Sequence, residues 1–319
     1  TFDYFMEHRD NILCNRNTVP TIIGISASNL PAYNMGRMRN SGWDGEISVG
    51  DRIGDWSYFV KANFTYAHNK ILEQDEVIRN EDYLYRPGLR YGQFFGYVAD
   101  GIFNSWEEVN AAGRPEYVMA NNNNKIQPGD VRYVDINGDG KINDDDQVPI
   151  GYSNFPEIMY GISLGGSYKN LDISLLFQGA THVSNMPSRR IMRGFYEYTG
   201  ANRDLLKSWS YERFVNNQKI VYPRYGVNGV GHNYLTSTYW LEDASYLRLK
   251  NVEVGYTFRQ ESLKKAGIGS IRIYVNGSNL LTWTDMLPGQ DPEVANAGVT
   301  NSEPYPVTRV FNFGLNVNF

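Results

Sequence analysis

The sequence has little cysteine, little histidine and no long apolar run. Cys14 is the only cysteine, so an intrachain disulfide is excluded, and the four histidines lie far apart without the spacing of a zinc site or a Ser-His pair. No stretch approaches the roughly 18 consecutive apolar residues of a membrane-spanning helix. The 30 Lys and Arg against 35 Asp and Glu include no basic run, so no nucleic-acid partner is expected.

What the sequence does contain is alternation of apolar and polar residues with a period of two. In Val307–Phe319 the apolar residues occupy one parity, and Asn or Gly occupies most of the other. A strand of this kind has one face suited to lipid or a core and one face suited to water. The same pattern recurs at Phe2–Met6, Trp43–Val49, Trp56–Tyr66, Ile158–Gly165, Leu171–Gln178, Val252–Phe258 and Ile271–Asn276.

Two architectures fit such strands: an antiparallel transmembrane β-barrel and a soluble antiparallel sandwich. The 24 Tyr, 15 Phe and 6 Trp, many at strand ends, favour the barrel because aromatic residues gather at membrane interfaces. The connections favour it too, since short turns at Asp51–Asp55 and Tyr168–Asn170 alternate with long loops, as in barrels of this type. The predicted long connections are Ile12–Arg39, His68–Phe155, Ala180–Tyr239 and Thr282–Pro306.

The fold class predicted is therefore all-β, an antiparallel transmembrane β-barrel with long extracellular loops. We expect eight or ten strands. The higher number would require a pair of strands between Tyr66 and Phe155, with Arg90–Val98 as one of the two.

A series of motifs, taken in order, resembles the SusC/RagA family of TonB-linked outer-membrane transporters. The motifs are Gly96–Tyr97, Asp100–Phe103, Pro128–Val131, Asp135–Ile142, Tyr168–Lys169, Phe177–Gly179, Trp240–Val252, Asn279–Trp283, Asp291–Glu293 and the terminal Phe319. The resemblance extends over essentially the whole chain and does not depend on any single motif.

In that family a barrel of about twice this strand count encloses an amino-terminal plug, and a TonB box precedes the plug. Nothing in the sequence matches either element. The resemblance therefore implies that residues 1–319 are the carboxyl-terminal portion of such a barrel, with coupling to TonB through the missing amino-terminal part. It also implies an outer membrane of a Gram-negative bacterium of the Bacteroidota, and a chain in contact with outer-membrane lipid.

The family imports oligosaccharides or, in some members, peptides, and it works with a SusD-like lipoprotein that covers the outer face as a lid. This resemblance implies that the chain is part of a TonB-dependent importer and is not an enzyme. An alternative remains open, in which the barrel anchors a non-transporting surface adhesin or binding protein. The substrate and the residues that contact it are not indicated. Outer-loop aromatic residues that can stack on sugar rings, contact the lid or pack within loops are Trp106, Tyr196, Tyr198, Tyr222 and Tyr225.

One stretch, 135–146, has the oxygen-rich spacing of an EF-hand-like calcium loop. Its predicted ligands at positions 1, 3, 5, 7, 9 and 12 are Asp135, Asn137, Asp139, Lys141 through its carbonyl, Asn143 and Asp146. Gly140 stands at position 6, where the loop turns sharply. The predicted cofactor is a structural Ca²⁺, because ligands from a single stretch organise that stretch and leave little open coordination.

Two other kinds of segment share features of this stretch. A solvated acidic turn fits as well, because Asn-Gly and Asp-Gly are turn dipeptides. A dockerin has nearly the same spacing, but dockerins carry two copies followed by helices, and here Pro149 and Gly151 follow a single copy.

A G-x-S-x-G pattern at Gly161–Gly165 lies inside an alternating strand, so it does not indicate a nucleophilic serine.

Overall fold

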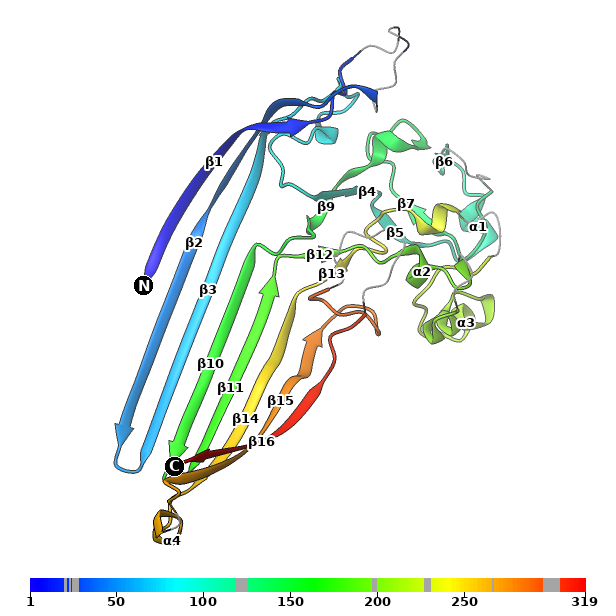
Figure 1. Cartoon of the computed structure of the whole chain (residues 1–319). Coiled ribbons are helices and arrows are strands. Elements are labelled where there is room, and N and C mark those ends of the chain that lie inside the picture. The colour runs from blue at the N-terminus through cyan, green and yellow to red at the C-terminus, as the bar shows by residue number, and fades with distance from the viewer. Residues whose placement is uncertain are drawn as a thin grey trace.

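The computed structural model describes residues 1–19, 22, 24, 29–118, 125–196, 200–226, 231–265, 267–294 and 305–319. Its main feature is an antiparallel sheet of eight long strands (Figure 1). In their order across the sheet, the strands are β1 (Phe2–Cys14), β2 (Tyr33–Ile53), β3 (Trp56–Glu73), β10 (Ile158–Tyr168), β11 (Leu171–Thr181), β14 (Tyr246–Phe258), β15 (Ser270–Thr284) and β16 (Val310–Asn318). No helix in the described part of the chain is long and apolar enough to cross a membrane.

The strands are joined by short turns at one end of the sheet and by long connections at the other (Figure 1). Gly54 and Asp55 link β2 to β3, and Lys169 and Asn170 link β10 to β11. Gly54 and Lys169 have φ of 62° and 53°, the left-handed conformation that two-residue hairpins use. At the same end the helix α4 (Glu261–Lys265) lies between β14 and β15. The predicted sorting of short and long connections is confirmed.

Eight strands, not ten, form the main sheet of the described residues. The segment Arg90–Val98 contributes β4 (Gln93–Gly96), which pairs instead with β9 (Val148–Ser153) in a separate two-stranded sheet. The connections predicted at Ile12–Arg39 and His68–Phe155 are shorter in the structure, because β1, β2 and β3 continue beyond their alternating part. For example, β3 runs on past Tyr66 to Glu73, where backbone pairing with β2 persists although the residues are mostly polar. The connection predicted at Ala180–Tyr239 is longer, since the next strand of the main sheet, β14, begins only at Tyr246.

The strand register assigns the two faces of the sheet as the alternation predicted. Directly paired residues share a face, and the pairing places Phe64, Leu175, Val254 and Phe313 on one face, which we call the apolar face. Asn63, Asp172, Glu253 and Asn312 lie on the opposite, polar face. Phe313 is 82% exposed, and most of the exposed large hydrophobic residues of the sheet share its face. The faces therefore differ in chemistry across the full width of the sheet.

The polar face carries a network that crosses four strands. The Arg272 guanidinium lies 2.5 Å from a carboxylate oxygen of Asp172 and 2.7 Å from one of Glu253. The Asn276 amide donates to Glu253 at 3.3 Å, and Asn312 donates to Asn276 at 2.9 Å. Charged and amide groups in such numbers are stable only where water or partner groups surround them, so this face belongs to an aqueous space.

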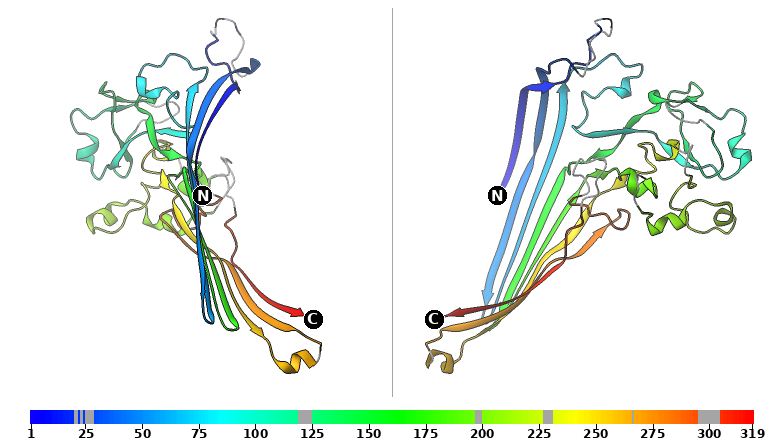
Figure 2. Two further views of the ribbon diagram at one scale, coloured as in Figure 1. Left: turned by 90° about the vertical axis from the view of Figure 1, so that its left-hand side faces the viewer. Right: turned by 45° about the vertical axis from the view of Figure 1, so that its right-hand side comes forward.

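The long connections 74–157, 182–245 and 285–309 gather beside one end of the sheet, and we call them together the loop layer (Figures 1 and 2). Its short strands pair as β5 (Ala99–Ile102) with β7 (Val131–Tyr133), β6 (Glu116–Tyr117) with β8 (Lys141–Ile142), and β12 (Ser184–Asn185) with β13 (Glu242–Asp243). Its helices are α1 (Trp106–Val109), α2 (Arg189–Met192) and α3 (Tyr211–Val215), and its 3₁₀ turns are Asp82–Leu84, Asp144–Asp146, Arg203–Lys207 and Gly231–Tyr234.

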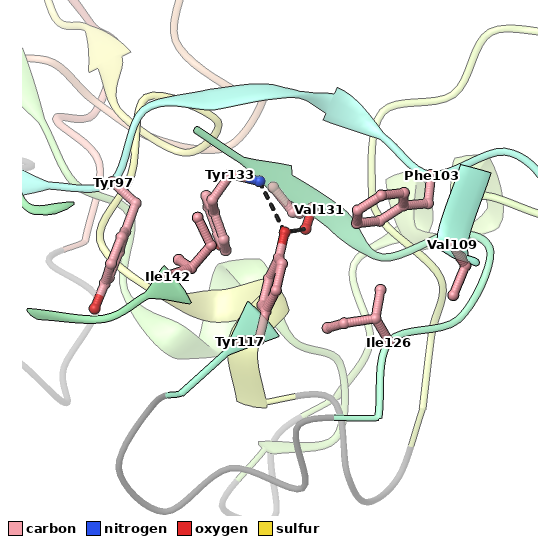
Figure 3. Packing of buried hydrophobic residues seen from close by; sticks show 8 residues of the cluster. All are labelled: Tyr97, Phe103, Val109, Tyr117, Ile126, Val131, Tyr133 and Ile142. Carbon is pink, nitrogen blue, oxygen red and sulfur yellow. Dashed lines mark hydrogen bonds between the residues drawn. The ribbon is translucent and has the colours of Figure 1, made fainter. Parts of the chain in front are cut away.

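The loop layer has a hydrophobic core of its own (Figure 3). The core residues are Tyr97, Phe103, Val109, Tyr117, Ile126, Val131, Tyr133 and Ile142. At its centre the Tyr117 hydroxyl accepts from the Tyr133 amide at 2.9 Å and donates to the Val131 carbonyl at 3.1 Å. Burial raises the pKa of Tyr117 to about 12. A second cluster contains Met192, Tyr222, Tyr234 and Trp240. The loops are thus a folded layer rather than separate connections.

Candidate functional site

The stretch 135–146 forms a compact turn closed by its own acidic side chains. The Asp135 carboxylate accepts from the backbone amides of Gly138 and Gly140 at 2.7 and 2.8 Å. Asn137 and Asp139 each accept from the amide two residues further on, at 3.1 and 2.8 Å. Gly138 and Gly140 have φ of 77° and 81°, so the turns of this loop require glycine.

The far end of the same stretch is a capping box rather than an open ligand pair. Asn143 and Asp146 cap the short 3₁₀ turn between them, and the buried Asp146 carboxylate accepts from the amides of Ile136 and Asn143, both at 2.8 Å. Asp145 accepts from the Asn80 amide, and its carbonyl accepts from the Tyr83 hydroxyl at 2.6 Å. These contacts tie the stretch to a neighbouring loop.

Two observations test whether this stretch fits a metal ion. Among the described residues, no group of three or more His, Cys, Asp and Glu side chains is placed to hold one. The internal bonds nevertheless leave lone pairs open, since a carboxylate offers about four acceptor positions and Asp135 and Asp139 use two and one of them. The donor set of Asp135, Asn137 and Asp139 is all oxygen, which suits calcium rather than a softer metal.

A buried carboxylate organises the centre of the loop layer. Asp130 is 0% exposed, and its oxygens lie 2.6 Å from the Arg224 Nε and 3.0 Å from the His232 Nε2. The Asn233 side chain donates to Asp130 at 2.8 Å and accepts from the Val131 amide at 2.9 Å. Burial by itself raises the pKa of Asp130, but the partners His232, Arg224 and Asn233 outweigh it and hold that pKa below its usual range. Asp130 therefore joins segments 94 to 103 residues apart.

A second carboxylate, Glu157, ties the rim of the sheet to the loop layer. Its oxygens lie 2.6 Å from the His68 Nδ1 and 3.2 Å from the His182 Nδ1, and the Arg90 guanidinium donates to it. Burial raises the pKa of Glu157, and its hydrogen bonds to Arg90 and His68 more than offset this, so the pKa lies below its usual value. The sequence placed His68 and His182 far apart, and only the fold brings them to one acid.

A third cluster holds the last long connection against the polar face. Arg248 of β14 is 1% exposed and lies 2.6 Å from Asp291 and 2.8 Å from Glu293. Lys250 reaches the same Glu293 at 2.8 Å. All three clusters are paired charges that fix loops in place, and none leaves a nucleophile beside a base. They are structural supports for the surfaces around them.

Two grooves formed by described residues are candidate binding surfaces. The larger, about 480 Å³, lies on the polar face of β2, β3, β10 and β11. Its polar lining includes Asp44, Glu46, Lys61, Asn63, Thr65 and Gln178. The smaller, about 350 Å³, lies between 77–86 and 144–147, beside the 135–146 stretch. Both are lined in part by charged and amide side chains.

The aromatic residues proposed from the sequence for sugar stacking differ in accessibility. Trp106 is exposed on α1, and Tyr225 is partly exposed and donates to the Gly194 carbonyl at 3.2 Å. Tyr222 is buried in the second core cluster, so it packs within the layer and is not available to a ligand. Tyr196 is partly buried, and Tyr198 lies outside the described residues.

No family model matches the sequence. Curated relatives do match it along its whole length. TonB-dependent receptor P3 of Formosa agariphila is 28% identical over 346 residues, covering 100% of this chain and 32% of that protein. TonB-dependent receptor P26 of the same organism is 29% identical, covering 99% and 32%. TonB-dependent receptor SusC of Bacteroides thetaiotaomicron is 23% identical, covering 99% and 30%.

The chain is similar to a portion of TonB-dependent receptors of the SusC/RagA type. It spans about a third of the length of these curated relatives. Two solved structures share the fold. The structure of the RagAB peptide transporter has a TM-score of 0.71 at 23% sequence identity. The structure of the RagAB peptide importer in its open-open state has a TM-score of 0.70 at 22% sequence identity. Each covers 100% of this chain and about a third of the matched chain. The all-β class and the barrel wall inferred from the alternation are thereby confirmed.

Proposed function

We propose that this chain forms part of the wall and the outer loops of a TonB-dependent importer in the bacterial outer membrane. The observation that carries the proposal is the two-faced sheet, with an apolar face exposed across eight strands and a charged face on the other side. Hydrocarbon is the surrounding in which such a face is stable. The names of the relatives support the same assignment.

The chain acts within a longer receptor. In the described residues β1 and β16 stand at the two edges of the sheet and pair with only one neighbour each. Free strand edges are not tolerated in hydrocarbon, so both edges pair with further strands of the receptor's barrel. The cargo is an oligosaccharide or a peptide, and the polar groove on β2, β3, β10 and β11 lines its route.

A SusD-like lipoprotein is the proposed partner on the loop layer. Its docking surface includes the exposed apolar side chains around α3, namely Leu206, Tyr211, Phe214 and Val215. Leu206 is 73% exposed, and an exposed apolar cluster of this kind on a water-facing loop is typical of a protein interface. Deleting the whole connection 180–239 is a poor test, because Met192 and Tyr222 in it belong to a core cluster.

The importer assignment is tested in cells that carry the full-length receptor gene. We expect the protein in the outer-membrane fraction, and growth on the imported oligosaccharide or peptide should depend on both this gene and TonB. A surface adhesin predicts the same location with growth unaffected by removing the gene. Finding the protein outside the outer membrane would contradict both assignments.

The lid contact is tested by Leu206→Glu with Val215→Glu in the full-length receptor. Co-purification of the lipoprotein should fall about tenfold or more, because each substitution places a charge where the lid would bury an apolar side chain. The control is Ile78→Glu, a still more exposed apolar position on another loop. Equal loss in both variants, or loss in neither, would place the docking surface elsewhere.

We also propose that the 135–146 stretch binds one Ca²⁺ with a structural role. Asp135, Asn137 and Asp139 would hold it with the Lys141 carbonyl, and their oxygen chemistry and spacing support the proposal. Asn143 and Asp146 mainly cap the turn. Calorimetry of the intact receptor should detect a site that Asp139→Ala removes and Asp100→Ala keeps. Absence of calcium binding in the folded wild-type receptor would refute it.

A further inference from the structure

A row of cationic side chains crosses β1, β2 and β3 near the loop-bearing end of the sheet. The register pairs His8 with Arg39, and Arg39 with Lys70, without a shift between these pairs and those of Trp43. Because side chains two residues apart on a strand share a face, Arg39 lies on the same face as Trp43. Trp43 pairs with Tyr66, which lies two residues from Phe64 on β3 and therefore on the apolar face. The cationic row thus lies on the apolar face.

The rows below it follow the profile of a membrane interface. Moving away from the cationic row, one row is aromatic, with Tyr4, Trp43 and Tyr66 in register. The row after it, still further from the cationic row, contains Phe2 and Phe64. The rings of Tyr4 and Trp43 lie 4.6 Å apart. Four residues separate the aromatic row from the cationic one, roughly 13 Å along the strand. For a tilted strand that is about 10 Å along the membrane normal, the depth range of lipid headgroups.

The two permanent charges of the row have no protein counter-charge. No described residue forms an ion pair or side-chain hydrogen bond with Arg39 or Lys70. The acidic groups on either side of the row are already paired, since Glu157 contacts His68 and Arg90. On the other side, Asp10 and Glu73 lie 3.0 and 3.5 Å from the Arg37 guanidinium between them. Like charges directly opposite each other in a sheet repel. An anion held between them would offset that cost.

We propose that Arg39 and Lys70 bind the phosphate group of an outer-leaflet lipid, whose acyl chains lie along the apolar face below. This inference rests on the proposed outer-membrane location. A guanidinium offers a planar fork that matches phosphate oxygens, and the Lys ammonium adds a second charge. The same face continues into aromatic and apolar rows, so the surface matches an amphiphile from headgroup to chain. Free phosphate would use the two cations alone.

The test uses the intact receptor purified in detergent, with bound lipid counted by native mass spectrometry. The probes are a phosphorylated glycolipid of the lipopolysaccharide type, the same glycolipid after removal of its phosphates, and inorganic phosphate. Wild type should prefer the phosphorylated glycolipid. Arg39→Gln with Lys70→Gln should weaken that binding roughly 30-fold, from about 1 kcal/mol per surface cation.

The matched control is Arg259→Gln with Lys265→Gln, which removes one Arg and one Lys at the short-turn end of the sheet (Figure 1). It should bind as wild type does. Should the double variant fail to fold, as judged by heat-modifiable migration, the single Lys70→Gln variant should still weaken binding about fivefold. Equal binding by wild type and the Arg39/Lys70 variant would overturn the proposal, as would equal affinity for inorganic phosphate or for the dephosphorylated glycolipid.

Cell fractionation separates this outcome from failure of the proposed function. A receptor found in the outer membrane, in which the two substitutions do not change lipid binding, refutes the lipid site and leaves the importer assignment standing. A receptor found elsewhere refutes the assignment on which the site rests.

Discussion

The main sheet exposes its large apolar side chains on one face, whereas the loop layer buries its own in a core. In the sheet, residues such as Phe64 and Phe313 point outward and are exposed, while charged groups such as Glu253 occupy the other face. In the loop layer, Phe103 and Ile142 are buried in a core. The proposed outer-membrane location accounts for this difference, because it would put hydrocarbon around the sheet and water around the loops.

The buried charges differ in the same way. The loop layer buries Asp130 completely and surrounds it with donors, whereas Arg272 and Asp172 on the polar face stay partly exposed to water. Removing a partner is therefore expensive at Asp130 and mild at Arg272 and Asp172. Local stability should follow the completeness of burial rather than the number of ion pairs.

The largest effect is expected at the centre of the loop layer. Asp130→Ala should destabilise this layer by about 3 to 5 kcal/mol, because Arg224 and Asn233 are left buried without an acceptor. Hydrogen exchange of the full-length receptor should show fast exchange in the loops and unchanged protection in the sheet. Asp100→Ala, which removes an exposed partner of Arg132, is the control and should cost less than about 1 kcal/mol. Loss of sheet protection as well would mean that the two regions unfold together.

Two adjacent leucines test the faces of the sheet directly. Leu175 lies on the apolar face and Leu176 on the polar face of β11. Leu175→Arg should destabilise the barrel by about 2 to 4 kcal/mol if it lies near the bilayer midplane, whereas Leu176→Arg should be nearly neutral. Refolding into lipid bilayers measures both. Equal costs at the two positions would contradict the assignment of faces.

Lowering the pH should loosen the loop layer before the sheet. The pKa of Asp130 is lowered in the folded protein, so its contribution to stability is present above the unfolded value of about 4 and is lost as pH falls through the folded pKa. Protection of the loop amides, corrected for the slower intrinsic exchange at low pH, should fall below about pH 4 in wild type. Asp130→Asn, which cannot titrate there, should remove this component of the pH dependence.

The alternation predicted most of the sheet because a period of two is written into each strand separately. Val307–Phe319 was predicted and Val310–Asn318 is observed, and the register places Phe311, Phe313 and Leu315 on one face, as the alternation predicted. The extension of β3 to Glu73 was missed because polar and apolar residues do not alternate between Ala67 and Glu73. In the 135–146 stretch the spacing located an acidic loop correctly, but spacing does not reveal that Asp146 is buried as a cap.

The clusters of the loop layer had no signal in the sequence. Asp130, Arg224 and Asn233 are ordinary polar residues until the fold brings them within hydrogen-bond distance across 94 to 103 residues. Likewise, Val131 and Ile142 lie in short segments with no periodicity of their own. Burial in such loops depends on neighbours from distant segments, which no local pattern records.

The sequence by itself determined the period of the strands, the two faces and the short turns, because each depends on residues a few positions apart. Only the tertiary structure decided which distant residues meet. Arg39 and Lys70 become neighbours through strand register, and Glu157 gains His68 and His182 through the closing of a long loop on the sheet rim. Register and loop packing are set by the summed contacts of many residues, so a contact between two particular side chains appears only when the chain has folded.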